Sequence, residues 1–253
     1  MEPEASRWLA YRHEVPGARL RLFCLGGGGA SMFGLWDLGM PAGVEVCPLQ
    51  LPGRENRLGE LPMIRISRIA DSLSEALAPW LDQPFALFGH SAGALSVFEL
   101  ARKLCRQGRR PPEWLFVSGH PAPHLAYRRP AASHLAPREF WQAMRDHFDI
   151  DPALLADEGL KDMLYPALRA DYELEETYVY TKEAPLDIPL SVFGGSRDLE
   201  TTEDELLAWR QHTSNRFRSR ILEGNHMFLA PQREALVAEL AHDLSQLLAT
   251  SVR

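Results

Sequence analysis

The sequence predicts an α/β fold in which a mostly parallel β-sheet is covered by helices on both faces. Short, almost continuously apolar runs alternate with longer stretches of helical periodicity along most of the 253 residues. Such alternation is typical of parallel strands buried on both faces. Residues 121–185 interrupt it with helical patterns alone. We therefore expect a helical lid subdomain over 121–185, inserted into an α/β core formed by residues 1–120 and 186–253.

Each expected element rests on its own pattern. The expected strands are the apolar runs at 20–25, 44–49, 85–88, 115–117, 188–193 and 220–222. The expected core helices have 3.6-residue periodicity and lie at 66–81, 92–107, 203–213 and 232–248. In the insertion, 137–147 and 159–180 have the pattern of amphipathic helices. Some of its apolar residues either pack the insertion onto the core or line a substrate pocket: Phe140, Trp141, Met144, Leu164, Leu168, Tyr172 and Tyr178.

Composition narrows the class of protein. Apolar residues make up 45% of the chain and charged residues 24%, which are ordinary values for a globular domain. The net charge of -7 argues against nucleic-acid binding. No apolar stretch approaches the roughly 20 residues of a membrane span, and no signal peptide is visible at the first residues. Cys24, Cys47 and Cys105 are odd in number, so we expect inert buried thiols and a cytoplasmic location.

A candidate nucleophile lies in the run Gly89-His90-Ser91-Ala92-Gly93. This G-x-S-x-G match follows the apolar run 85–88 and begins the helix expected at 92–107, which is the strand-turn-helix setting of a nucleophile elbow. The helix dipole and the free N–H of Ala92 would favour negative charge near the Ser91 hydroxyl. The match alone is weak evidence, because a glycine-flanked turn with a helix-capping serine has the same letters.

A serine nucleophile needs a base, and His226 is the best placed of nine histidines. It lies between the last expected strand and the last expected helix, in the chain order serine, acid, histidine of this hydrolase arrangement. His212 and His242 fall on expected helices and should lie at the surface. His90 belongs to the elbow itself. His120 follows the run 115–117 and stays open as a substrate contact.

The acid that orients the base should follow a late strand. Asp198 does so, directly after the run 188–193. Glu200 and Asp204 are the alternatives, although Asp204 also suits the first turn of the next helix. Asp198 is the preferred candidate.

The loop after the first expected strand could stabilise the oxyanion of an acyl-transfer reaction. Two backbone N–H groups are needed, one from Ala92 and one from this loop. The loop contains Gly26-Gly27-Gly28-Gly29, and Gly27 or Gly28 is the expected second donor. A phosphate-binding loop is the rival interpretation, but Ala30-Ser31-Met32 follows where that motif requires Lys and Ser or Thr.

These motifs together resemble those of the stand-alone type II thioesterases of nonribosomal peptide and polyketide synthases. The resemblance covers nearly the whole chain and rests on five segments: 49–55, 88–94, 98–102, 168–172 and 224–228. It implies the α/β-hydrolase fold and editing of stalled or misprimed synthase modules. Three features depart from the family pattern. The early loop contains only glycine, Ala92 stands where methionine is frequent, and Gly-Asn-His-Met replaces the usual Gly-Gly-His-Phe. The acyl-chain preference therefore does not carry over.

The implied reaction is hydrolysis of acyl or peptidyl thioesters on the phosphopantetheine arm of carrier protein domains. Ser91 would form an acyl-enzyme with His226 as base and Asp198 as orienting acid, without a metal or bound cofactor. Carrier proteins are typically acidic, so docking would need cations near the active edge. Arg54, Arg57, Arg128 and Arg129 are the candidates for docking, and solvent-facing charge without a partner is the preferred alternative for them. The basic cluster at 102–110 should lie at the far end of its helix.

Three other functions remain open from the sequence. One is a carboxylesterase or lipase, and another is a chain-terminating fatty acyl thioesterase. The third is a non-catalytic binding protein on the same fold.

Overall fold

A single six-stranded sheet organises the chain. The structure is a computed structural model that describes residues 7–126, 128–147 and 152–250. The strand order is β2-β1-β3-β4-β5-β6, and every neighbouring pair is parallel. The strands are β1 Leu20–Gly26, β2 Val44–Pro48, β3 Phe85–His90, β4 Trp114–Ser118, β5 Leu190–Gly195 and β6 Phe217–Leu222. The predicted parallel sheet is confirmed, and all six predicted strands are present.

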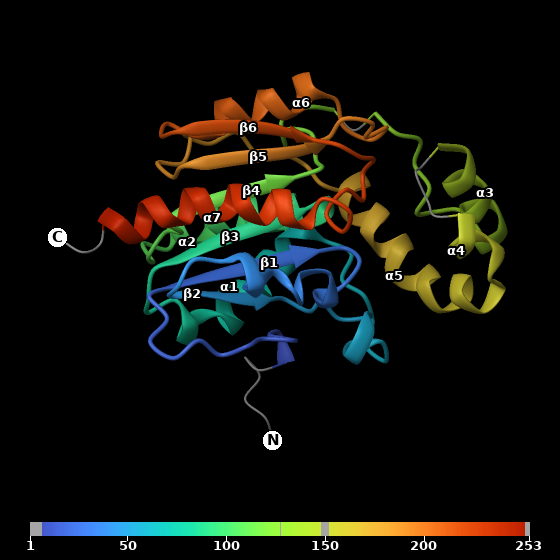
Figure 1. The fold of residues 1–253 in the computed structure, drawn as a ribbon. Helices are drawn as coiled ribbons and strands as arrows, with labels where there is room; N and C mark the ends of the chain where they lie inside the picture. The colour runs from blue at the N-terminus through green and yellow to red at the C-terminus, as the bar shows by residue number, and fades with distance from the viewer. Residues whose placement is uncertain (1–6, 127, 148–151, 251–253) are drawn as a thin grey trace.

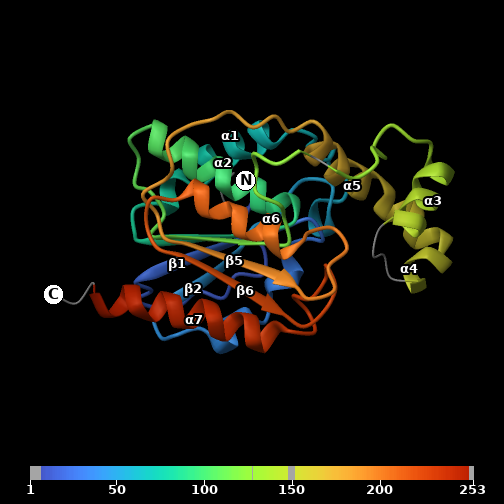
Figure 2. The ribbon, with the colours of Figure 1, turned by 90° about the horizontal axis from the view of Figure 1, so that it is seen from above.

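Helices cover both faces of this sheet (Figures 1 and 2). One face carries α1 Ile66–Ala76, α2 Ala92–Arg106 and α6 Glu203–Leu207, and the other carries α7 Arg233–Thr250. The remaining helices, α3 Pro137–His147, α4 Pro152–Ala156 and α5 Glu158–Glu176, follow β4. Single-turn 3-10 helices lie at Ala30–Phe33, Trp36–Gly39, Glu55–Arg57, Ala78–Trp80 and Ala208–His212. None of the described helices is long and apolar enough to cross a membrane.

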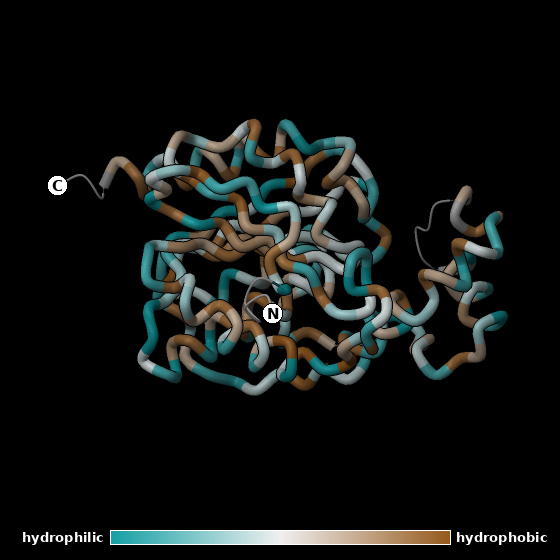
Figure 3. Tube along the Cα trace, turned by 90° about the horizontal axis from the view of Figure 1, so that it is seen from below, coloured by the Kyte–Doolittle hydropathy of each residue, from teal (hydrophilic) through white to brown (hydrophobic). Residues whose placement is uncertain are grey.

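The sheet separates two hydrophobic cores because successive side chains of a strand point to opposite faces. In β1, Phe23 and Leu25 join the core under α1 and α2, whereas Leu22 and Cys24 join the core under α7. Because both faces are buried, the strands are apolar at nearly every position instead of alternating between apolar and polar residues. In Figure 3 hydrophobic stretches of the trace run through the interior of this body.

The element boundaries differ from the predicted ones where local chemistry intervenes. The helix predicted over 66–81 ends at Ala76 and is followed by a 3-10 turn containing Pro79, since proline disfavours helical backbone in the preceding residue. The short α4 was not predicted. Cys24 and Cys47 are buried as expected, but the expectation for Cys105 is wrong, because it is exposed on α2.

The inserted helices have a small core of their own. Phe140, Trp141 and Met144 of α3 pack with Tyr172 of α5, and Leu168 lies against them. Tyr178, by contrast, packs against the core under α1 and α2. These contacts favour the packing interpretation for most of the insertion's apolar residues. In Figure 1, α3 and α4 lie to one side of the sheet and α5 leads back to it. The division into a core and a lid subdomain stays a prediction.

Candidate active site

A sharp turn at Ser91 joins β3 to α2. Ser91 has φ 57° and ψ −129°, a conformation that costs energy for a non-glycine residue and is concentrated at functional sites. Its N–H donates to the carbonyl of Ser118 at 2.9 Å. A Cβ atom on Gly89 would lie 2.3 Å from the carbonyl oxygen of Gly93, and one on Gly93 would lie 2.3 Å from that of Leu25. The turn therefore requires glycine on both sides of the serine, as the motif indicated.

The glycine-rich loop lies beside this turn because β1 and β3 are neighbours in register. Gly26 pairs with His90, so the chain leaves β1 next to Ser91. The carbonyl of Gly27 accepts a hydrogen bond from Arg54 Nε at 2.6 Å. A Cβ atom on Gly27 would lie 2.8 Å from the carboxylate of Asp171 on α5. The loop is thus enclosed by the insertion, and the oxyanion role of Ala92 with Gly27 or Gly28 remains a prediction.

His226 and Asp198 meet at the carboxyl end of the sheet. Nδ1 of His226 lies 3.1 Å from Oδ2 of Asp198, whose side chain is fully buried. Since a carboxylate only accepts, Nδ1 carries the proton and Nε2 is left for the reaction. Asp204 lies in the first turn of α6, the helix-start position that its place in the sequence also suited. Gly119 leaves room for the imidazole, because a Cβ atom there would lie 3.3 Å from Cε1 of His226.

A carboxylate from the insertion reaches the serine, although no sequence motif predicted this contact. Oγ of Ser91 donates to Oε1 of Glu175 at 3.3 Å. Oε2 of Glu175 and Oε2 of Glu200 both bind the guanidinium of Arg129. Oε2 of Glu200 also lies 3.9 Å from Nε2 of His226. Among the described residues Ser91 has no hydrogen bond to His226, so the serine faces the insertion.

A signal for Glu175 was present in the sequence. Asp171 and Glu175 are four residues apart on α5, and like charges at that spacing destabilise an isolated helix. Such a pair is more stable where cations from other elements lie beside it. The structure supplies Arg54 for Asp171 and Arg129 for Glu175.

The other histidines occupy different environments. His90 is buried against His226, with 4.9 Å between ring centroids, and its Nδ1 lies 3.0 Å from Oγ of Ser118. His242 is exposed, as expected. The expectation for His212 is wrong, since it is buried and its Nε2 lies 2.8 Å from Nδ1 of His124. His120 is buried beside Glu175, with 3.8 Å between Nε2 and Oε1.

The carboxylates change the basicity of His226. Burial alone would lower its pKa, but Glu200, Asp198 and Glu175 outweigh burial and raise the pKa of His226 to about 9. Burial likewise raises the pKa of Glu200, which His226 and Arg129 only partly oppose. A histidine must be neutral to take a proton from serine. In this arrangement His226 is therefore protonated at neutral pH and becomes a base only as the pH rises.

We expect the pH profile of kcat/KM to report this pKa. The wild-type rate should rise with pH through a midpoint near 9, because the neutral imidazole is the active form. In Glu200→Gln the midpoint should move down toward the ordinary histidine value of 6.5, and the rate at pH 7 should rise about tenfold per unit of downward shift.

The exposed Glu203 of α6 offers a matched control for that measurement. Glu203→Gln removes a charge three residues away and should leave the midpoint unchanged. A wild-type midpoint near 6.5, or equal midpoints in the wild type and Glu200→Gln, would contradict the assignment.

A pocket of about 370 Å³ lies on the insertion side of these carboxylates. Its lining includes Glu175, Glu200, His120, Leu125, Tyr178 and Tyr180. Ser91 and His226 are not among the lining residues, so the two glutamates stand between the pocket and the predicted catalytic pair. An acyl group reaching Ser91 from this side would pass charged rather than purely apolar surface.

The cations proposed for docking are mostly unavailable at the surface. Arg54 is 4% exposed and binds Asp171, and Arg57 is 9% exposed and binds Glu60. Arg129 is engaged by Glu175 and Glu200. The expectation of solvent-facing charge is therefore wrong for Arg54 and Arg57 and unsupported for Arg129. Arg128 is 55% exposed and pairs with Glu205, so it alone of the four keeps the expected exposure.

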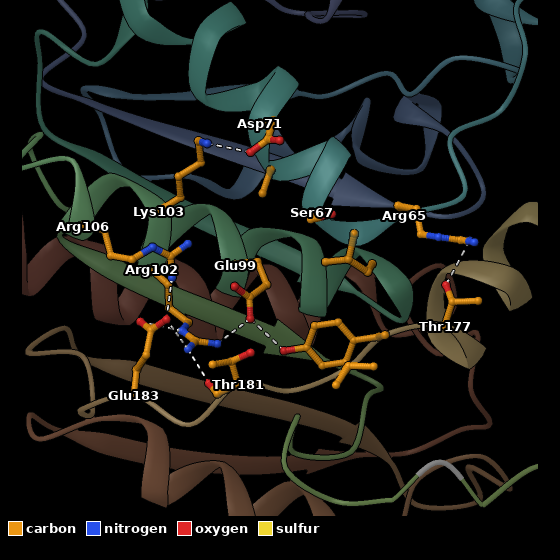
Figure 4. Close-up of a pocket in the computed structure, with 14 residues that line it drawn as sticks. Arg65, Ser67, Asp71, Glu99, Arg102, Lys103, Arg106, Thr177, Thr181 and Glu183 are labelled. Atoms are coloured by element: carbon orange, nitrogen blue, oxygen red, sulfur yellow. Dashed lines mark hydrogen bonds and ion pairs between the residues drawn. The ribbon is translucent and has the colours of Figure 1, made fainter.

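A second pocket, of about 380 Å³, involves the basic cluster of α2 (Figure 4). It lies between α1, α2 and the segment after α5, and its lining contains none of Ser91, Asp198 and His226. Its cations are paired, with Lys103 on Asp71 at 2.6 Å and Arg102 on Glu99 at 2.6 Å. Arg106 binds Glu183 at 2.7 Å. This pocket therefore offers no uncompensated basic surface for a partner.

A family model decides what kind of protein carries this site. The model described as Thioesterase domain matches residues 18–244, which include every candidate catalytic residue. The chain belongs to the thioesterase domain family. It is a hydrolase that acts on thioester bonds, with the α/β-hydrolase fold.

Individual relatives of this thioesterase are named for the biosynthesis of gramicidin S, linear gramicidin and prodiginine. Gramicidin S biosynthesis protein GrsT of Aneurinibacillus migulanus is 35% identical, over 98% of each chain. Linear gramicidin dehydrogenase LgrE of Brevibacillus parabrevis is 40% identical, over 96% of this chain and 94% of that protein. The solved structure of RedJ, a thioesterase of the prodiginine pathway in Streptomyces coelicolor, has a TM-score of 0.83 at 37% identity. It covers 90% of this chain and 87% of that one. The predicted resemblance is confirmed.

Proposed function

We propose that this thioesterase releases acyl or peptidyl groups from the phosphopantetheine arm of synthase carrier domains, as a stand-alone editing enzyme. The observation that carries the proposal is a serine at a strained strand-to-helix turn at the same end of the sheet as a buried histidine-aspartate pair. The solved structure of YbtT, 29% identical with a TM-score of 0.76, is a type II thioesterase from the yersiniabactin NRPS/PKS biosynthetic pathway, which supports carrier domains as the source of the thioester.

The reaction would proceed through an acyl-enzyme. Oγ of Ser91 attacks the thioester carbonyl carbon while Nε2 of His226 takes the hydroxyl proton, and Asp198 stabilises the imidazolium. The C–S bond then breaks, and the thiolate takes that proton as it leaves. Water attacks the acyl-serine with His226 again as base, which frees the carboxylic acid and restores Ser91. The N–H groups of Ala92 and of Gly27 or Gly28 would hold the oxyanion in both steps.

Glu175 has to give up the serine before this reaction can begin. Its carboxylate accepts the hydroxyl proton that His226 must receive, so the described arrangement is a resting one. Rotation of the Ser91 side chain toward His226 would free the hydroxyl while Glu175 keeps its place on α5. Hydrogen bonds of catalytic groups often tighten only when substrate is bound.

Two other functions have to be compared with the proposed one. The relative LgrE is named a dehydrogenase. The dinucleotide-binding motif G-x-G-x-x-G is incomplete here, because Ser31 occupies the place of its third glycine after Gly26 and Gly28. A carboxylesterase would use the same serine, histidine and glycine loop. The ratio of thioester to oxygen-ester hydrolysis separates it from a thioesterase that edits carriers.

The proposed function is tested with loaded carrier proteins. Carriers bearing acetyl, medium and long acyl groups are incubated with the wild-type chain, and the loss of acyl mass is followed by intact mass spectrometry. We expect release of several acyl groups, faster than that of the matching oxygen esters. A carrier without enzyme gives the background rate.

Each outcome of that experiment points to one function. Release confined to a single long or medium chain length would favour fatty acyl chain termination. No release from any carrier, together with normal turnover of simple esters, would overturn the proposal in favour of an esterase.

A further inference from the structure

Two hydrogen-bond acceptors of buried side chains lie close together where the insertion meets Ser91. The first is Oε1 of Glu175, which in the resting arrangement accepts a hydrogen bond from the Ser91 hydroxyl. The second is Nε2 of His120, a buried atom with no hydrogen-bond partner among the described residues. The two atoms are 3.8 Å apart. Unpartnered buried polar atoms are rare and require an explanation.

The tautomer of His120 makes Nε2 an acceptor. Nδ1 of His120 lies 2.7 Å from the carbonyl oxygen of Pro121, and a carbonyl can only accept, so Nδ1 carries the proton. Burial lowers the pKa of His120, although Glu175 and the Pro121 carbonyl oppose that effect, and the ring is therefore neutral. Its Nε2 then presents a lone pair toward Glu175 rather than an N–H.

The same place carries surplus negative charge when the enzyme is ready to react. Asp171, Glu175, Asp198 and Glu200 are all largely buried there, and their cationic side-chain partners are Arg54, Arg129 and His226. His226 must be neutral to act as a base, which leaves four carboxylates against two guanidinium groups. Burial, aided by Glu175, already raises the pKa of Asp171 to about 6 in spite of Arg54. A cationic group from the substrate would restore the balance.

We propose that Glu175 and His120 form a subsite for an ammonium group on the acyl chain, so that this enzyme prefers aminoacyl thioesters to neutral or anionic ones. An ammonium carries three donors and no acceptor. One nitrogen can reach two acceptors 3.8 Å apart at ordinary hydrogen-bond lengths. The ammonium would replace the serine hydroxyl on Oε1 at the moment when that hydroxyl gives its proton to His226. The proposal rests on the thioesterase function proposed above.

An isosteric series of acyl groups tests the subsite. The 2-substituent of a propionyl thioester is varied as NH₃⁺ (alanyl), OH (lactyl), CH₃ (isobutyryl) and COO⁻ (methylmalonyl), on a carrier protein and on pantetheine. Each kcat/KM is divided by the uncatalysed hydrolysis rate, which removes the intrinsic reactivity of the alanyl ester. We expect the alanyl thioester to be favoured over the isobutyryl one by about tenfold or more, as for hydrogen bonds to charged groups, and the methylmalonyl one to be poorest.

Glu175→Gln should remove the preference. The neutral amide keeps the shape of the side chain and loses the charge, so the ratio of alanyl to isobutyryl hydrolysis should fall toward one, whatever the lost charge does to both rates through the basicity of His226. Glu173→Gln on the same helix is the matched control, since Glu173 binds Arg65 and Arg169 rather than the site. It should keep the wild-type ratio. A purely structural effect of either variant would lower both rates together and leave the ratio unchanged.

The outcomes separate the subsite from the function on which it rests. A ratio near one in the wild type, or an equal ratio in the wild type and Glu175→Gln, would overturn the subsite alone. Loss of all hydrolysis in Glu175→Gln would also overturn it, because Glu175 would then act in the proton transfer itself. Selectivity on pantetheine with no turnover of any carrier would uphold the subsite and overturn the carrier function. No hydrolysis of any thioester would overturn both.

Discussion

Ser91→Ala is expected to lower kcat for thioester hydrolysis by roughly 10⁴- to 10⁶-fold, since without the nucleophile only binding and oxyanion stabilisation remain. The residue sits at a turn where φ is 57°, a conformation that alanine tolerates poorly but no worse than serine does. The variant should therefore fold, and its thermal unfolding midpoint should lie close to that of the wild type. The rate is measured by thiol release from acetyl-pantetheine.

Ser96→Ala is the matched control for this variant. Ser96 is buried one turn further along α2, and its hydroxyl only donates back to the carbonyl of Ala92 at 2.9 Å. Its loss should leave the rate within a few-fold of wild type. A fluorophosphonate should label the wild type and Ser96→Ala but not Ser91→Ala. Undiminished hydrolysis by Ser91→Ala would contradict an acyl-enzyme mechanism on Ser91.

Asp198→Asn is expected to reduce kcat by about 10⁴-fold with little change in KM. The amide can donate to Nδ1 of His226, which would then accept and place the proton on Nε2, the nitrogen that has to receive it from the serine. The geometry of the 3.1 Å contact would persist while the tautomer reverses. Burst and steady-state kinetics with a chromogenic thioester would measure the loss.

Two neighbouring acids decide whether Asp198 is the orienting residue. Asp204→Asn should change kcat little, because Asp204 lies in the first turn of α6. Glu200→Gln should shift the pH profile rather than abolish the rate. If Glu200→Gln lost as much activity as Asp198→Asn is expected to lose, the assignment of Asp198 as the acid on which His226 depends would be wrong.

The sheet and the serine turn could be predicted because their causes are local. The strand residues of β1 and β3 are apolar on both faces, and that pattern does not depend on which strands become neighbours. The turn at Ser91 needs Gly89 and Gly93 for steric reasons that act within a few residues and against β1. The order of serine, aspartate and histidine along the chain then indicated which residues should meet at one end of the sheet.

The environment of the site could not be predicted, because it depends on where the insertion lies. Arg54 and Arg129 are cations of the kind that often lie at a surface and bind acidic partners. Each is instead bound by a carboxylate of α5, which is distant in the sequence. His212 falls on a polar helical pattern, yet it is buried beside His124. A charged residue is buried only where oppositely charged or hydrogen-bonding groups surround it, and a local sequence pattern does not identify those groups.

The sequence by itself determined the parallel sheet with helices on both faces, the elbow at Ser91 and the candidate partners Asp198 and His226. These follow from periodicity, glycine placement and chain order, which are properties of short segments. Only the tertiary structure brought Glu175, Arg129 and Glu200 to the serine and the histidine. Such buried charges form where distant elements exclude water together, so their pairing, and with it the basicity of His226, exists only in the folded chain.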